Sequence, residues 1–575
     1  MSGPATPYSR YMPSSVPGTV PSRFALRTAT NQAPPLVGHN VVTSDAALTD
    51  AVRRHGSEEV LDSLVALGAE AGTADAREHG MLANQHSPEL VNYDRYGNRV
   101  DDVRFHPSWH WLMERAVGHG LAAAPWEHQA GGDEHAHVRR AAGFLAWSQT
   151  EPGHGCPISM TYAAVPALRA DAALAAEWTP LLASLRYDPG LRPASAKLGA
   201  LAGMGMTEKQ GGSDVRANVT IARPTGVEGE YTLHGHKWFT SAPQNDLFLV
   251  LAQAPGGLTC FVMPRVLPDG TANRLDVVRL KDKLGNKSNA SSELEFDGTV
   301  VRRLGEEGRG VRTIIEMVAA TRLDCVLGSA SLMRKAVAEA SWHVAHRSAF
   351  GGTLADKPLM RNVIADLAVE SEAATALALR LAAAVDRADD PGEAALRRLA
   401  LPLAKFWVCK RTPGMVAEAL ECLGGNGYVE ESGLPLLYRE APLNSVWEGS
   451  GNVNALDVLR ALSREPEALN AYLAEIGIAR GADPRLDAAI EQLLAMLGSM
   501  MGGDQLEAGA RRLAGRMAAV LQGSLLVRYA PAEVADVFCA SRLGWAEGNG
   551  HDGTYGMLAG GDLAAIVART TPTLG

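Results

Sequence analysis

Residues 203–215 read GMGMTEKQGGSDV, and this stretch divides a chain whose other parts show helical patterns. Segments rich in Val, Leu, Phe and Thr follow it, separated by Gly, Pro or Asn: 231–241, 247–254, 258–263, 275–280 and 292–296. Short apolar segments at this spacing are typical of a small antiparallel sheet or barrel. The sequence therefore predicts a mainly α protein with a central β domain.

The polar groups around this stretch suit a heteroaromatic ring that carries a phosphate. Hydroxyls of Thr207, Ser213 and Ser241 can bond ring carbonyls, and N–H groups of the Gly211-Gly212 turn can bond phosphate oxygens. Phe239 would add an aromatic surface beside them. A Gly-rich turn before a strand is more often only a turn, so the ligand hypothesis needs a second motif.

That second motif is NSVWEGSGN at residues 444–452, followed at once by a helical pattern. A carboxylate beside Trp447 is partly desolvated, which raises the pKa of Glu448 and suits it to proton abstraction near neutral pH. The glycines let the backbone approach a bulky ligand, and the helix N-terminus favours an anion. The alternative is a helix-start glutamate that complements the helix dipole, with the glycines serving as a turn.

Composition narrows the class of protein. The length of 575 residues suggests roughly three to four domains, and no apolar run reaches the ~20 residues of a membrane span. The net charge of −10 makes the whole molecule a poor electrostatic match for nucleic acid. The six cysteines form no C-x-x-C pair, which favours free thiols in a reducing cytoplasm. Seven histidines between residues 106 and 154 lack companion ligands, so we expect no metal site.

The pattern along the chain divides it into five parts. Residues 1–36 are rich in Pro, Ser, Thr and Gly without an apolar secretory segment, and we expect a disordered tail. We then expect a helical domain at 37–200, the β domain at 201–302, an up-down helical bundle at 303–462 and a C-terminal helical domain at 463–575.

Several motifs, taken together in their order and spacing, resemble the acyl-CoA dehydrogenase family. They are the 203–215 stretch, Lys237-x-aromatic-x-Ser241, Arg347-x-x-Phe350-Gly351, LGGNGY at 423–428 and Trp447-Glu448-Gly449. The spellings DKLGNKSNAS at 282–291, TRLDC at 321–325 and YRE at 438–440 are similar to the AidB-like alkylation-response branch. The resemblance runs from about residue 42 to the C-terminus and is dense up to residue 460.

The resemblance implies an FAD cofactor held between the sheet and the bundle. The cofactor-binding residues that it implies are Met204, Gly205, Met206, Thr207, Gly211, Gly212, Ser213, Phe239, Thr240, Ser241, Arg347, Gly424, Gly425, Asn426, Gly427, Val446, Trp447, Gly449, Ser450, Gly451 and Asn452. Thr207 and Ser241 would also contact the substrate. In the family, Arg347 and the 424–427 turn would serve a neighbouring subunit, which implies a homo-oligomer, usually a tetramer. A simpler role for Arg347 is a cation at a helix C-terminus.

By the same resemblance, Glu448 removes the α proton of an acyl-CoA thioester while the β hydrogen leaves as hydride to flavin. A short or branched substrate such as isovaleryl-CoA is expected. Nitroalkane-oxidising relatives carry a shorter acid at this position, so glutamate favours the dehydrogenase. Pro358 stands where the wider family has a glutamine that assists FAD binding across subunits, and this weakens that one expected contact.

The branch also implies protection against DNA alkylation damage, with double-stranded DNA bound by the C-terminal domain. Arg511, Arg512 and Arg516 lie at helical spacing and could form one basic stripe, although a solvated helix face is the favoured interpretation. Arg460 could contribute to a basic patch assembled across subunits. However, residues 470–575 contain eight arginines against eleven acids, and no lysine follows Lys410. Because phosphate binding needs a basic surface, the charge of this domain argues against strong DNA binding. The alternative function is a DNA-binding flavoprotein with vestigial catalysis that shields DNA or scavenges alkylating agents.

Overall fold

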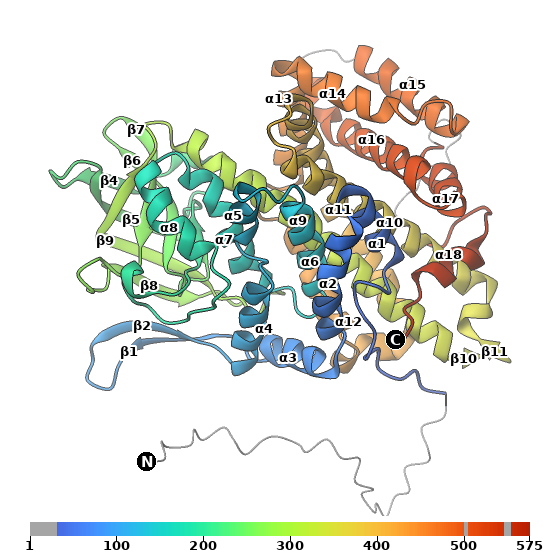
Figure 1. Cartoon of the computed structure of the whole chain (residues 1–575), viewed down its shortest axis with the longest axis horizontal. Helices are drawn as coiled ribbons and strands as arrows, with labels where there is room; N and C mark the ends of the chain where they lie inside the picture. Colours follow the sequence, from blue (N-terminus) through green and yellow to red (C-terminus); the bar gives the residue numbers. More distant parts are fainter. Residues whose placement is uncertain (1–30, 500–503, 545–553, 575) are drawn as a thin grey trace, which may run out of the picture.

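The computed structural model describes residues 31–499, 504–544 and 554–574. A group of long helices lies at the centre of the molecule, with the β domain at one side and the C-terminal helices at the other (Figure 1). The predicted tail falls outside the described residues up to residue 30. Its last residues lie against α9 (Gly310–His346): Trp342 Nε1 donates to the Pro34 carbonyl at 2.8 Å, and Leu36 is buried beside Ala338.

The N-terminal part is helical, as predicted, but it also contains a hairpin that the sequence reasoning missed. The helices are α1 (Ala46–His55), α2 (Glu58–Ala71), α3 (Ala74–Gln85), α4 (Pro107–Gly118), α5 (Ala124–Ala130), α6 (Ala136–Trp147), α7 (Gly155–Leu168) and α8 (Ala172–Leu182). The hairpin consists of β1 (Glu89–Tyr93) and β2 (Arg99–Arg104), joined by a turn in which Asp94 accepts from the Tyr96 and Asn98 N–H groups. Side chains at α1, α2 and α3 N-termini cap the first turn, which explains where these helices begin.

The β domain closes into a small barrel. Its strands are β3 (Ala202–Gly205), β4 (Ile221–Pro224), β5 (Glu230–Ser241), β6 (Leu247–Ala254), β7 (Gly257–Pro264), β8 (Leu275–Leu280) and β9 (Ser291–Leu304). The order is β3-β6-β4-β5-β9-β7, and β7 also pairs with β6, so no open edge is left between β6 and β7. Most pairs are antiparallel, as predicted, but β3 and β4 run parallel to β6. Phe248 and Phe261 are fully buried in the core of this barrel.

Long helices form the bundle that faces the barrel. They are α9, α10 (Pro358–Asp386) and α11 (Pro391–Cys422), followed by the shorter α12 (Leu434–Glu440) and α13 (Gly451–Arg464). Between α9 and α10, β10 (Ser348–Ala349) pairs with β11 (Gly352–Thr353) in a tight hairpin. α11 begins where Asp390 accepts from the N–H groups of Gly392 and Glu393, because the preceding turn cannot satisfy those donors.

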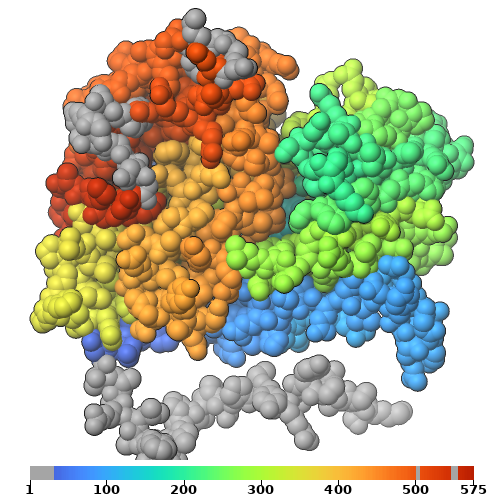
Figure 2. Space-filling view, turned by 180° about the vertical axis from the view of Figure 1, so that it is seen from behind, coloured from blue at the N-terminus to red at the C-terminus, as the bar shows by residue number. Residues whose placement is uncertain are grey.

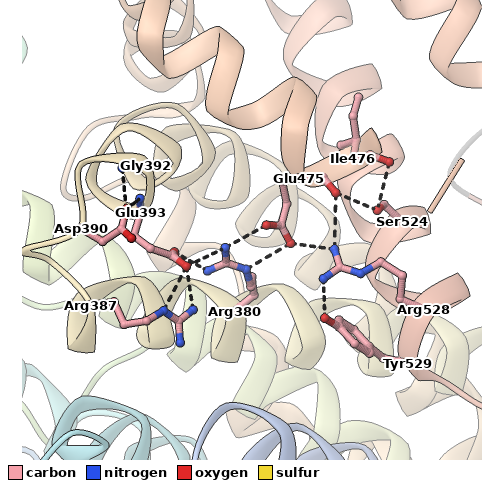
Figure 3. A network of polar contacts seen from close by, with 10 residues as sticks. All are labelled: Arg380, Arg387, Asp390, Gly392, Glu393, Glu475, Ile476, Ser524, Arg528 and Tyr529. Atoms are coloured by element: carbon pink, nitrogen blue, oxygen red, sulfur yellow. Dashed lines mark hydrogen bonds and ion pairs between the residues drawn. The ribbon is translucent and has the colours of Figure 1, made fainter. Parts of the chain in front are cut away.

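The C-terminal helices pack on the bundle. They are α14 (Pro466–Gly477), α15 (Pro484–Gly498), α16 (Asp504–Tyr529), α17 (Ala532–Arg542) and α18 (Leu563–Thr570). Figure 3 shows one joint between the two parts: Arg380 of α10 donates to Glu475 of α14 at 2.9 Å and to Glu393 of α11 at 2.7 Å. Arg528 of α16 bonds the same Glu475 at 2.8 Å. These buried charges are paired on both sides, as their desolvation requires.

Two properties of the described residues bear on the class of protein. No helix among them is long and apolar enough to cross a membrane. All six cysteines are buried, and none of them is bonded to another.

Candidate active site

Glu448 lies in a strained turn between the 3-10 helix Leu443–Ser445 and α13. Its φ of +57° is unusual for a residue with a side chain, and Gly449 follows at φ +92°. Nζ of buried Lys405 holds this turn by donating to the carbonyls of Asn444, Trp447 and Gly449 at 2.6, 2.7 and 2.8 Å. One buried ammonium group thus accepts no bond but donates to three carbonyls of the turn, which lie outside the hydrogen-bond ladder of any helix or strand.

A second cation holds the backbone of the same residue. Arg322 Nε donates to the Glu448 carbonyl at 3.1 Å, and its Nη1 bonds Asp457 Oδ2 at 2.7 Å. A Cβ at Gly449 would lie 3.1 Å from Val453 Cγ1, tighter than nine in ten real Cβ contacts, and its φ of +92° is one that residues with side chains rarely adopt. The carboxyl group therefore projects from a backbone that has little freedom to move.

The environment raises the pKa of the Glu448 carboxyl group, in the direction predicted from sequence. Burial raises this pKa, while a hydrogen bond from Thr321 and the charges of Lys405 and Arg322 lower it without offsetting the burial. Thr321 Oγ1 is 2.6 Å from Glu448 Oε2. A desolvated carboxyl group with a raised pKa suits a general base.

Across the site, the predicted glycine-rich turn joins β3 to the barrel. Met204 and Gly205 lie in β3, and Met206 and Thr207 follow it. A Cβ at Gly212 would lie 2.6 Å from Thr207 Oγ1, so only glycine allows this turn to approach that hydroxyl. Within residues 31–499, 504–544 and 554–574, the hydroxyls of Thr207 and Ser213 make no hydrogen bond, and Ser213 is exposed.

A buried ion pair that the sequence reasoning did not assign fixes this turn. Glu208 Oε1 is 2.6 Å from Lys237 Nζ, both side chains are fully buried, and Lys237 also donates to the Leu251 carbonyl at 2.7 Å. Glu208 Oε2 accepts from the Val219 N–H at 2.7 Å. The alternation of apolar residues around Lys237 could have revealed a buried cation, since it occupies an inward position of β5.

The end of β5 offers groups that fit a flavin. Phe239 is 52% exposed, which is high for a large aromatic ring on a strand. The neighbouring Thr240 is fully buried, yet its Oγ1 has no hydrogen-bond partner among the described residues. Ser241 Oγ lies 3.4 Å from Ser291 Oγ. Because a buried hydroxyl without a partner is costly, Thr240 fits a ligand that presents a polar ring atom there.

Arg347 and the 424–427 turn lie together, at a different place. Arg347 donates to the Asn31 carbonyl, and Asn426 Nδ2 donates to Gln32 Oε1 at 3.2 Å. Gly424, Gly425, Asn426 and Gly427 form the 3-10 helix Gly424–Tyr428. Among the residues that the structure describes, no hydrogen bond or ion pair joins either group to Glu448 or to the 203–213 turn. Phe350 and Tyr428 beside them are 95% and 82% exposed.

The predicted basic stripe is small. Arg511 and Arg512 are exposed at the start of α16, Arg516 is half-buried, and Arg460 lies 3.4 Å from Asp457. Arg511 also sits 5.6 Å from the centre of the Phe406 ring. The other five C-terminal arginines each form an ion pair: Arg480 with Glu491, Arg485 with Asp483, Arg528 with Glu475, Arg542 with Asp366 and Arg569 with Glu372. This domain therefore exposes few cations without an acidic neighbour.

Four predicted residues lie close to Glu448 in the sequence. Val446 is exposed, Ser450 is the N-cap of α13, and Gly451 and Asn452 form its first turn. Within the described part of the chain, no group of three or more His, Cys, Asp or Glu side chains could hold a metal ion. From behind, a hollow separates the green β domain from the orange part of the chain that contains α13 and α14 (Figure 2).

Comparisons with known proteins agree with this geometry. Residues 31–189 match the adaptive response protein AidB N-terminal domain, 203–299 the acyl-CoA dehydrogenase middle domain, and 308–463 the acyl-CoA dehydrogenase C-terminal domain. The chain is 46% identical to AidB of Escherichia coli (strain K12), over 89% of this chain and 93% of that protein. It is similar to the crystal structure of Caenorhabditis elegans ACDH-11 in complex with C11-CoA, with a TM-score of 0.82 and 29% identity over 90% of this chain and 93% of that one.

A second solved structure, the apo-form of Bd2924, has a TM-score of 0.79 and 28% identity, covering 87% of this chain and 99% of that one. These matches confirm the predicted fold class. Together with the acyl-CoA dehydrogenase of Bacillus anthracis complexed with FAD (TM-score 0.61, 19% identity, covering 81% of this chain and 88% of that one), they confirm the predicted cofactor, FAD.

Proposed function

This chain belongs to the acyl-CoA dehydrogenase family, in its AidB branch, and from that premise we propose that it oxidises an acyl-CoA thioester with Glu448 as the general base. The observation that carries the proposal is the Glu448 carboxylate, which is desolvated, bonded by Thr321 and held on a rigid turn by Lys405 and Arg322. The thioester class is supported by the C11-CoA complex of the C. elegans relative.

Each residue of this site would have one role in the reaction. A Glu448 oxygen takes the α proton, and the electrons of that C–H bond become the second bond between the α and β carbons. When bound, FAD supplies the acceptor for the hydrogen that leaves the β carbon with its electron pair. Thr207 and Ser213 would hold the cofactor on the barrel side, with Gly211 and Gly212 giving it room. The buried Thr240 hydroxyl would bond the ring.

Thr321, Arg322 and Lys405 would act on the base without touching the substrate. The two cations favour the ionised carboxylate, which is the form that accepts a proton. The Lys405 bonds to three carbonyls keep the φ +57° conformation of Glu448 in place. A base held in this way needs no reorganisation when the substrate binds.

A short or branched acyl chain is the proposed substrate, and isovaleryl-CoA is the probe. The flavin absorbance of the purified protein would be followed during an anaerobic titration, beside a Glu448→Gln control. We expect bleaching in the parent and none in the variant. Absence of bleaching in both, with FAD firmly bound, would contradict the acyl-CoA proposal and leave FAD with another substrate.

The same premise supports a homotetramer located in the cytoplasm. Arg347 and the 424–427 turn would reach the cofactor of a neighbouring subunit, which explains why they lie apart from Glu448 in one chain. The nearby Phe350, Leu359 and Tyr428 are 95%, 82% and 82% exposed, and a subunit interface would cover them. An Arg347→Gln variant should retain less FAD after gel filtration, while light scattering reports whether the tetramer persists.

A DNA-binding flavoprotein that protects against alkylation is the second candidate. The observation in its favour is that Arg511 and Arg512 are exposed without an ion pair among the described residues. The five paired arginines of the same domain count against it. Mobility of duplex DNA would be measured at two salt concentrations, beside Arg512→Gln. Real phosphate contacts lose affinity steeply with salt, whereas a salt-independent or absent shift would exclude this function.

A further inference from the structure

A second cavity lies away from Glu448, where three distant segments meet. It has a volume of about 540 Å³ and lies between β2, α4, the loop at 187–191 and the end of β7. Neither Glu448 nor any residue of the 203–213 turn lines it. Ligand pockets of proteins are usually ~300–1,000 Å³, so this cavity can hold a small organic molecule. Nothing in the proposed dehydrogenase reaction uses it.

The charges around this cavity leave one cation without a partner. Each lining acid has a cationic neighbour: Asp101 has Arg99, Asp102 has Arg104, Asp188 has Arg192, and Asp246 has Lys197 at 3.0 Å. Arg265, by contrast, has no carboxylate within ion-pair distance among the described residues. Arg265 is therefore the one cation of the cavity lining without a direct ion pair, and Asp101 and Asp246 act on it only from a longer distance.

Arg265 is held by a backbone carbonyl, and one donor of its guanidinium group has no hydrogen-bond partner among the described residues. Its Nη1 donates to the Pro243 carbonyl, which fixes the plane of the group. Its Nε is buried and has no hydrogen-bond partner among the described residues. The residue is 7% exposed, and burial lowers the pKa of Arg265 to about 10. A buried cation without a partner is costly, and a ligand carboxylate would remove that cost.

A second polar atom beside Arg265 is also unsatisfied. Gln244 lines the same cavity, and its Oε1 is buried without a hydrogen-bond partner in the described part of the chain. Native proteins rarely leave buried polar atoms unpaired, and two in one cavity indicate an occupant. Asp101, at the same cavity, has a φ of +44°, and strained residues of this kind cluster at ligand sites.

The opposite wall is aromatic and apolar. The rings of Phe105 and Trp109 are stacked with centroids 4.7 Å apart, and Met113 lies one turn further along α4. Tyr187 closes the wall and shares a 2.8 Å hydrogen bond with His110 Nδ1. A cavity with one unpaired guanidinium and an aromatic wall selects an anion with an apolar body.

We propose that this cavity binds a small organic monocarboxylate, with the carboxylate on Arg265 and the apolar body against Phe105 and Trp109. The group is recognised as a free acid, because Arg265 is the one lining cation that has no carboxylate within ion-pair distance among the described residues. The site is separate from the acyl-CoA site and its ligand need not be oxidised.

The test uses octanoate and benzoate, with octanamide and benzamide as neutral controls of the same shape. Calorimetric titration of the FAD-loaded protein should detect one of the acids, and the matched amide should bind at least about tenfold more weakly. Equal binding of acid and amide, or no binding of either acid at millimolar concentration, would overturn the proposal. So would an equal thermal shift with sodium chloride at the same concentration, because the cavity would then hold any anion.

Two variants locate the binding. Arg265→Met should abolish the preference for the acid over the amide, and Arg265→Lys should restore part of it. Met113→Trp should weaken acid and amide alike by filling the apolar end, which keeps the test valid if Arg265→Met folds poorly. Isovaleryl-CoA bleaching should be unchanged by octanoate. Competition between the two ligands would place octanoate in the acyl-CoA site and refute a separate cavity.

Discussion

Glu208 and Glu448, one in each of the two motifs singled out in the sequence, are both buried but differ in whether a cation pairs with the carboxylate. Glu208 is fully buried, and although burial alone would raise its pKa, Lys237 at 2.6 Å and the Thr220 and Val219 N–H groups hold that pKa below its usual value. Glu448 has no cation within ion-pair distance of its carboxylate among the described residues, and burial raises its pKa. Burial therefore raises the pKa of a carboxyl group only where no direct counter-ion offsets it.

The largest expected effect comes from removing the unpaired carboxylate. Glu448→Gln keeps the shape of the side chain but cannot accept a proton, so flavin reduction by isovaleryl-CoA should slow by ~10²–10⁴-fold or more. Stopped-flow absorbance under anaerobic conditions measures this rate. Glu208→Gln is the matched control, and a similar loss of chemistry with FAD still bound would break the distinction between the two glutamates.

The next largest effect is expected from removing Lys237, the cation that pairs with Glu208. Lys237→Met leaves Glu208 buried without its cation, which should destabilise the protein by ~3–5 kcal/mol. The midpoint of thermal unfolding and the retention of FAD measure this loss. The double variant Lys237→Met/Glu208→Gln should recover a large part of the stability. If the double variant is no more stable than the single one, an unpaired Glu208 carboxylate is not the cause of the destabilisation.

A smaller effect is expected from removing the hydrogen bond that Thr321 makes to Glu448. Thr321→Val removes the 2.6 Å hydrogen bond to the Glu448 carboxylate, so the pKa of Glu448 should rise further. The acid limb of the profile of flavin reduction rate against pH should move to higher pH, with about a fivefold slower rate at pH 6, equivalent to ~1 kcal/mol. Thr321→Ser should behave like the parent. An unshifted profile would mean that the hydroxyl bonds the carbonyl of Val318 or Met317 and not the carboxylate.

The smallest effect is on stability, and its sign follows from the raised pKa of Glu448. A carboxyl group whose pKa is higher in the folded than in the unfolded state destabilises the folded protein once the pH exceeds the unfolded value. Glu448→Gln should therefore unfold about 2 °C higher than the parent at pH 8, and the difference should vanish towards pH 4. Exposed Glu59→Gln should show no such trend.

Local patterns in the sequence predicted most of the barrel. β6 and β8 have the expected bounds, and β5 begins one residue earlier than predicted. β9 extends to Leu304, well past the predicted 296, because residues 299–304 pair with the start of β5 and with β7. β3 was missed, since Ala202–Gly205 is half glycine and forms a strand only through its parallel pairing with β6.

At the candidate site too, local sequence patterns revealed some residues, while others depend on contacts between distant parts of the chain. Glu448 could be singled out because Trp447 and the glycines around it are its neighbours in sequence. Thr321, Arg322 and Lys405 were not assigned roles, because they come from α9 and α11 and meet Glu448 only in the folded chain. A lysine within the apolar segment LPLAKFWVC at 401–409 was the one local signal for Lys405.

Taken by itself, the sequence determined the order of the helical and β regions, the family, and the residues whose local neighbours define them, Glu448 and the 203–215 turn. Only the tertiary structure decided which buried charges are paired. It gave Glu208 a lysine, left Glu448 to a hydroxyl, and left Arg265 without a carboxylate. The physical reason is that desolvation and ion pairing depend on distances of a few ångströms between residues tens to hundreds of positions apart, which no local pattern encodes.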